Sequence, residues 1–109
     1  EELYLANFSC YGQGVDAAGA GVGIISTVRG DDTNPAPYAC YGGTSMATPY
    51  VTGVLAAKLS RDRGYKRMAG DERRVNHARA LLDQICEDIG LSPEFQGRGL
   101  ARFRRGNGE

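Results

Sequence analysis

A serine at position 45 follows a pair of glycines and opens an apolar, helix-like stretch. Gly42 and Gly43 allow the backbone to turn sharply, and Thr44 is expected to cap the helix that follows. Apolar residues recur at helical spacing after this point, at Val51, Val54, Leu55 and Leu59. The free N–H groups and the dipole of a helix start favour negative charge. The Ser45 hydroxyl could therefore attack a carbonyl carbon while these groups stabilise the oxyanion, as in a serine hydrolase.

The motif around this serine extends over residues 43–53, which read Gly-Thr-Ser-Met-Ala-Thr-Pro-Tyr-Val-Thr-Gly. This stretch resembles the serine motif of the subtilisin-like serine proteases (peptidase S8 family), Gly-Thr-Ser-Met-Ala-(Thr/Ser)-Pro-His-Val-(Ala/Thr)-Gly. Tyr50 alone departs from it. The histidine that the family has at that position is not the catalytic one, so Tyr50 does not by itself argue against activity. The resemblance implies a serine endopeptidase whose nucleophile, Ser45, forms an acyl-enzyme with its substrate.

Three further segments resemble the same family and occur in its order. Residues 6–12 are similar to its Ala-Ser-Phe-Ser-Ser-Tyr-Gly segment, and residues 96–101 to its Tyr-Gly-x-Gly-Leu-(Val/Ile) segment. Residues 15–27 are similar to its Val-Asp-Val-Ala-Ala-Pro-Gly-Val-x-Ile-x-Ser-Thr run, but Ala20 replaces the proline that would fix the turn. The resemblance thus covers about residues 4–105 and implies the C-terminal third of a catalytic domain.

The resemblance also implies roles for the residues around Ser45. The Ser45 backbone N–H would be one oxyanion donor, and the Thr44 hydroxyl could assist it. Tyr41, four residues before the serine, would lie on the leaving-group side of the substrate cleft. Gly43 would also line the substrate.

A serine protease of this kind needs a histidine to take the serine's proton and an aspartate to orient that histidine. In the family both lie far upstream of the serine, as does an asparagine that supplies the second oxyanion donor. We expect these groups before Glu1, in the same precursor or on a partner chain, and therefore predict that the isolated chain is inactive. An alternative is a non-catalytic structural or interaction module derived from such a protease. The sequence leaves both possibilities open.

His77 is the only histidine of the chain and lies off the apolar stripe of its predicted helix. We therefore predict a partly exposed surface residue and not the missing base. The α/β-hydrolases offer a rival motif, with Asp71 and His77 in their chain order. Ala47 breaks that motif, and the short interval between the two residues has no room for the intervening sheet, so this alternative is rejected.

The elements needed to place Ser45 can be located from periodicity and turn residues. The predicted fold class is α/β: the C-terminal part of a subtilisin-like three-layer fold with a mostly parallel sheet, in which short strands precede two long helices. The chain is expected to form one portion of a single domain, divided into strands and loops at 1–43, the serine helix at 44–60, a second helix at 71–89 and a tail at 90–109. Within these regions, strands are expected at 3–10, 15–18, 23–28 and 38–41, and one short segment at 100–103.

Composition narrows the possible partners. The 13 basic and 13 acidic residues balance, and the arginine-rich tail has only Phe103 as an interleaved aromatic, so nucleic-acid binding is not expected. The chain has no apolar run long enough for a membrane span and no signal-peptide pattern, although the family is most often secreted. The expected partners are a polypeptide substrate and the missing N-terminal part of the catalytic domain.

No cofactor or metal is predicted. Asp16 and the pair Asp31–Asp32 lack the ligand spacing of a calcium loop. The three cysteines match no metal pattern, and free buried thiols are expected, with a disulfide between Cys10 and Cys40 as the alternative. Cys86 lies on the apolar stripe of the second predicted helix and is expected in the core.

Overall fold

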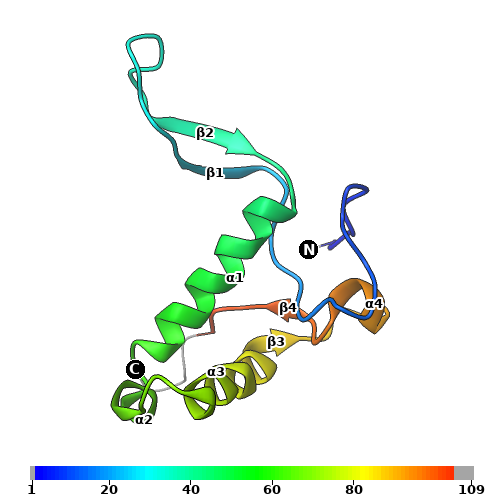
Figure 1. Ribbon diagram of the computed structural model, residues 1–109. Coiled ribbons are helices and arrows are strands. Elements are labelled where there is room, and N and C mark those ends of the chain that lie inside the picture. Colours follow the sequence, from blue (N-terminus) through cyan, green and yellow to red (C-terminus); the bar gives the residue numbers. More distant parts are fainter. Residues whose placement is uncertain (1, 105–109) are drawn as a thin grey trace.

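The computed structural model of the chain describes residues 2–104. A long helix, α1 (Thr44–Leu59), runs through the middle of the structure (Figure 1). A hairpin of β1 (Ile24–Thr27) and β2 (Tyr38–Tyr41) extends from its N-terminal end. The elements near its other end and along its side are α2 (Arg63–Arg67), α3 (Glu72–Ile85), β3 (Cys86–Glu87), α4 (Pro93–Gln96) and β4 (Leu100–Ala101).

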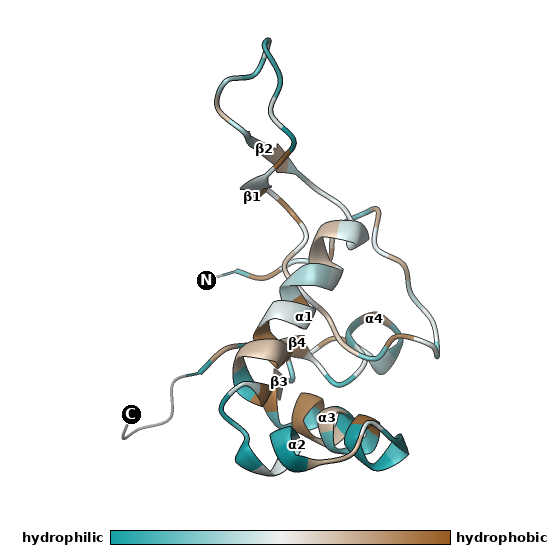
Figure 2. Cartoon of the chain, turned by 60° about the vertical axis from the view of Figure 1, so that its left-hand side comes forward, coloured by the Kyte–Doolittle hydropathy of each residue, from teal (hydrophilic) through white to brown (hydrophobic). Residues whose placement is uncertain are grey.

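The first helix begins at Thr44 and ends at Leu59, which confirms the predicted serine helix to within one residue. Val54 and Leu59 of α1 are buried and the helix contacts α3, whereas Gly53 and Ala56 are exposed. Figure 2 shows weakly polar to apolar colours along α1 and strongly hydrophilic ones on α2. A helix without a charged face normally lies inside a protein. Part of α1 is therefore uncovered by the described residues.

The second predicted helix begins where expected but ends early. The Asp71 side chain caps α3 by accepting a hydrogen bond from the Arg73 N–H at 3.0 Å. The helix stops at Ile85 because Cys86 takes an extended conformation and pairs antiparallel with Ala101. The predicted extension to residue 89 is thus wrong, and Cys86 is half-buried in β3 instead of lying in a helical core. Burial raises the pKa of its thiol.

The strands of the hairpin confirm two predictions, and the strands expected before it are wrong. β1 and β2 pair antiparallel with Ile24 opposite Tyr41. The predicted strand at 3–10 instead contains a turn closed by the Ser9 N–H on the Ala6 carbonyl, at 3.0 Å. Residues 15–18 make only isolated bridges, from Ala17 and Ala18 to the C-terminal region. Among residues 2–104, β1–β2 and β3–β4 are two-stranded antiparallel sheets, so the described fold mixes helices with small antiparallel sheets.

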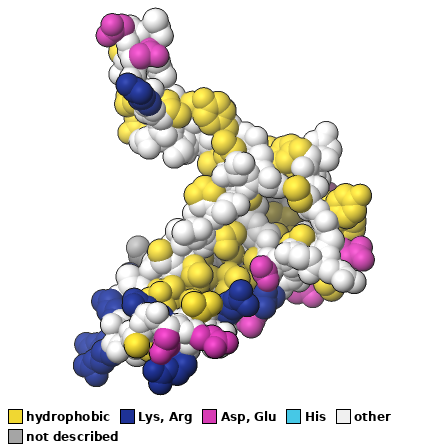
Figure 3. All heavy atoms as spheres, viewed as in Figure 1, with side chains coloured by type: hydrophobic (Ala, Val, Ile, Leu, Met, Phe, Trp, Pro, Cys, Tyr) yellow, Lys and Arg dark blue, Asp and Glu magenta, His cyan; other side chains and the backbone are white. Residues whose placement is uncertain are grey.

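The core of this structure is small and open. The buried hydrophobic residues in the described part are Val54, Leu59 and Ala101. The radius of gyration is 16.1 Å, against about 13 Å for a compact domain of this length. An open hollow of about 670 Å³ lies between α1, the N-terminal segment and residues 15–22, and Figure 3 shows apolar side chains around it. Such a surface is typical of a domain from which a further layer is absent.

All three cysteines are free. Cys10 and Cys40 are exposed, so the disulfide alternative does not apply and the expectation that these thiols are buried is wrong. Within residues 2–104, the helices are too short or too polar to cross a membrane.

Candidate active site

The candidate nucleophile, Ser45, lies in the first turn of α1 and is exposed. Its hydroxyl has no hydrogen-bond partner among residues 2–104. Because of its position in the first turn, its backbone N–H has no acceptor within the helix. Both groups are therefore available to a ligand at the N-terminal end of α1, where the helix dipole favours negative charge.

Gly43, and not Thr44, is the N-cap of α1. The prediction that Thr44 caps the helix is wrong, because Thr44 already belongs to the first turn. Gly43 has φ 156° and ψ 165°, a conformation available essentially only to glycine. Its N–H donates to the Gly21 carbonyl at 2.7 Å, and its own carbonyl accepts from the N–H groups of Met46 and Ala47 at 3.1 and 3.2 Å. The turn before Ser45 is thus held from both sides.

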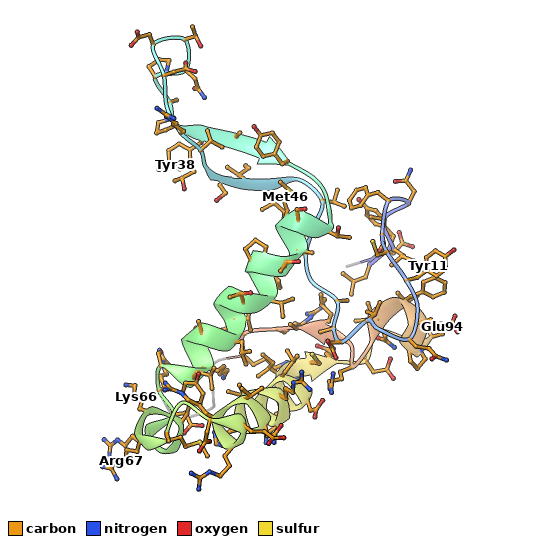
Figure 4. The ribbon with its side chains drawn as sticks, viewed as in Figure 1. Tyr11, Tyr38, Met46, Lys66, Arg67 and Glu94 are labelled. Carbon is orange, nitrogen blue, oxygen red and sulfur yellow. The ribbon has the colours of Figure 1, made fainter. Side chains whose placement is uncertain are left out.

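The hairpin brings its aromatic residues to the same end of α1. Tyr41 is the last residue of β2, pairs with Ile24 across the hairpin and is 54% exposed. Figure 4 shows Tyr38 on the hairpin and Met46 on the adjoining first turn of α1. Tyr41, Gly43, Thr44 and Ser45 therefore lie close together in the sequence, where the end of β2 leads into the start of α1. Their roles in substrate binding and oxyanion stabilisation remain predictions.

His77 lies at the other end of the structure. Its Nε2 is 2.5 Å from Oδ2 of Asp62, a residue that follows the C-terminal end of α1. A helix of 16 residues is about 24 Å long. Figure 4 shows Lys66 and Arg67 of α2 at the end opposite Met46. His77 is half-buried and cannot reach the proton of Ser45, which confirms that it is not the base of this serine.

Comparison with known proteins shows the family of the chain. No known family profile matches the chain. Over 95 residues it is 53% identical to alkaline elastase YaB of Bacillus sp. (strain YaB), covering 87% of this chain and 21% of the relative. Over 95 residues it is 37% identical to the halolysin-like extracellular serine protease Nep of Natrialba magadii, covering 87% of this chain and 15% of the relative. Over 51 residues it is 47% identical to subtilisin BL of Lederbergia lenta, covering 47% of this chain and 17% of the relative.

The chain belongs to the subtilisin-like serine proteases. It spans between 9% and 24% of the length of its curated relatives. This subtilisin-like chain therefore accounts for only a minor part of any protein of their size.

The contact between Asp62 and His77 in this subtilisin-like chain was not predicted from the sequence. The Asp62 side chain also caps α2 by accepting from the Tyr65 N–H at 2.9 Å. That backbone hydrogen bond, followed by the one to His77, lowers the pKa of the Asp62 carboxyl. An aspartate three residues before Tyr65 is a recognisable helix-start signal. The Asp62–His77 pair connects the start of α2 to α3 and lies far from Ser45, so we interpret it as a structural contact.

Two of the three acidic residues considered for calcium, Asp16 and Asp31, have other partners. Asp16 lies 3.0 Å from the Arg98 guanidinium. Asp31 accepts hydrogen bonds from the Thr33 hydroxyl and from the N–H groups of Thr33 and Asn34, which lower the pKa of its carboxyl. Within the described chain, no group of three or more His, Cys, Asp or Glu side chains could hold a metal ion.

Proposed function

We propose that this chain supplies the nucleophile of a serine endopeptidase. Ser45 attacks the scissile carbonyl to form an acyl-enzyme, which water later hydrolyses, and the Ser45 N–H donates to the oxyanion. The observation that carries this proposal is that the Ser45 hydroxyl and the Ser45 N–H, at a helix start, have no hydrogen-bond partner among residues 2–104. It is supported by relatives whose names describe serine proteases.

The base of this reaction must come from elsewhere. His77 is paired with Asp62 at the far end of α1. We therefore propose that the histidine, the aspartate and the asparagine donor lie outside this sequence, in the same precursor or on a partner chain. The uncovered face of α1 and the adjoining hollow of about 670 Å³ suit the remainder of a catalytic domain, including its mostly parallel sheet.

The substrate in this proposal is a polypeptide. Tyr41 lies on the leaving-group side of the substrate cleft and contributes an exposed ring next to the nucleophile's turn. Gly43 lines the substrate. Secretion is consistent with the name of the relative from Natrialba magadii, an extracellular protease.

Labelling with a fluorophosphonate probe tests this function. The probe is applied to the isolated chain, to the full-length product of the gene and to Ser45→Ala of each. The full-length product should be labelled only when Ser45 is present. The isolated chain should remain unlabelled, because a nucleophilic serine without its base loses roughly six orders of magnitude in turnover. Ser60→Ala, at the opposite end of α1, is the matched control and should leave labelling unchanged.

A second candidate is a non-catalytic module of the same ancestry. It is favoured by the engagement of His77 with Asp62, which leaves Ser45 without a histidine among the described residues. Absence of Ser45-dependent labelling in the full-length product would support this module and contradict the endopeptidase. The two candidates therefore give opposite results in one assay.

A further inference from the structure

A short glycine-containing segment, residues 19–21, lies directly against the first turns of α1. A methyl group at Gly19 would be 2.8 Å from the Ala47 carbonyl oxygen and 2.8 Å from Cγ2 of Val51. A methyl group at Gly21 would be 2.8 Å from the Gly43 carbonyl oxygen and 3.2 Å from Cβ of Ala47. Ordinary Cβ contacts begin near 3.4 Å, so this backbone approaches the helix as closely as it does only because side chains are absent.

The same segment is fixed on its other side to the C-terminal region. The Ala18 N–H donates to the Gly99 carbonyl at 2.9 Å, and the Ala101 N–H donates to the Ala18 carbonyl at 3.0 Å. Ala101 is fully buried in β4. Residues 18–21 are thus a bridge between a buried strand and the start of the serine helix.

Gly21 contacts both polar groups of Gly43. Its carbonyl accepts the Gly43 N–H at 2.7 Å, and its Cα faces the Gly43 carbonyl oxygen so closely that no methyl group fits. That carbonyl is also the acceptor for the Met46 and Ala47 N–H groups that start the helix. Gly21 is therefore in direct contact with the turn that precedes Ser45.

We propose that Gly21 is a positioning residue for catalysis, which acts through Gly43 to set the place of the Ser45 hydroxyl and N–H. This inference rests on the function proposed above. In Gly21→Ala the new methyl group would lie 0.6 Å inside the ordinary contact limit of 3.4 Å. Because misplacement of reacting groups by about 1 Å can cost on the order of a hundredfold in rate, a fall in kcat of at least about tenfold is expected.

The test compares three alanine variants of the full-length product. Gly19→Ala introduces contacts as short as those of Gly21→Ala but places them against Ala47 and Val51, away from Gly43. Gly14→Ala introduces no contact within 4 Å. Gly21→Ala should lower kcat with KM within about twofold of the wild type. Gly19→Ala should lower kcat far less, and Gly14→Ala should leave it unchanged. Equal loss in Gly19→Ala and Gly21→Ala would overturn the proposal, because packing alone would then explain it.

Hydrogen exchange of residues 42–47 separates this proposal from the proposed function. In the wild type the Gly43 amide should be protected by the Gly21 carbonyl. It should exchange faster in Gly21→Ala and not in Gly14→Ala. If the wild type shows no Ser45-dependent activity, the proposed endopeptidase function is contradicted. The exchange data then test by themselves whether Gly21 holds Gly43 in place. If Gly21→Ala does not fold, wild-type exchange of the Gly43 amide at the unprotected rate would overturn the proposal, and protection would support it.

Discussion

The conformation of Gly43 gives a quantitative prediction for the candidate active site. At φ 156° and ψ 165° this residue occupies a region that is essentially restricted to glycine. An alanine there would have room, since its methyl group would lie 3.5 Å from Sδ of Met46 and 3.8 Å from the Ser45 nitrogen. The cost of Gly43→Ala is therefore backbone strain and not a clash, on the order of 1–3 kcal/mol.

The chain can relieve this strain by rotating the peptide groups on either side of residue 43. Rotation would break the 2.7 Å hydrogen bond from the Gly43 N–H to the Gly21 carbonyl and would move Ser45. If this rotation relieves all of the strain, the arrangement with a correctly placed serine becomes less favourable by the same free energy, and fewer molecules adopt it. A penalty of about 1–3 kcal/mol corresponds to roughly a 5-fold to 150-fold slower reaction at Ser45.

The matched control is the neighbouring glycine. Gly42 has no positive φ, and a methyl group there would meet its nearest atom, the Gly21 carbonyl oxygen, at an ordinary 3.5 Å. The assay is the second-order rate of fluorophosphonate labelling at Ser45 in the full-length product, divided by the amount of folded protein. Gly42→Ala should label at nearly the wild-type rate. Labelling of Gly43→Ala as fast as that of Gly42→Ala would refute the argument that this glycine conformation places the serine.

Two further predictions concern the elements that support the site. The Tyr65 N–H and then His77 hold the pKa of Asp62 below its usual range, so its ionised form stabilises the fold at neutral pH and this contribution is lost as the pH falls through the lowered pKa. Asp62→Asn should therefore lose less helix on acidification than the wild type, as measured by far-ultraviolet circular dichroism. An equal loss of helix at low pH in both proteins would contradict this. The side chain of Gln96 is buried and makes three hydrogen bonds: it accepts one from the Ile89 N–H and donates to the Leu91 carbonyl and to the Asp88 carboxylate. Gln96→Leu should cost about 1 kcal/mol for each bond in urea unfolding, whereas exposed Glu94→Gln should have little effect.

The parts of the fold that could be predicted from the sequence are those with local causes. The serine helix follows from its apolar periodicity and from the glycine pair before it, and both of its ends were located to within a residue. The hairpin strands at 24–27 and 38–41 are short, rich in strand-forming residues and joined by a loop with turn residues. Each of these signals lies within the element that it specifies.

The wrong predictions concern elements whose state depends on distant partners. Residues 3–10 have a strand-like composition, but a strand forms only where another strand can accept its hydrogen bonds, and the described residues place none beside it. The second helix was extended past Ile85 because its apolar stripe continues. Cys86 leaves the helix to pair with Ala101, and no pattern within the helix announces that contact.

The candidate site depends both on local sequence signals and on contacts between distant segments. The motif of residues 43–53 predicts Ser45 as the nucleophile and contains the glycine before it, but it does not specify what holds that glycine in place. Gly21 performs this task, fixed through Ala18 to Gly99 and β4, so the serine turn depends on three segments that are far apart in the sequence. The face that α1 leaves exposed extends the same argument, because a helix without a charged face normally lies inside a protein, with other elements packed around it. The same helix that presents the candidate nucleophile thus also indicates where the rest of the proposed catalytic domain would pack.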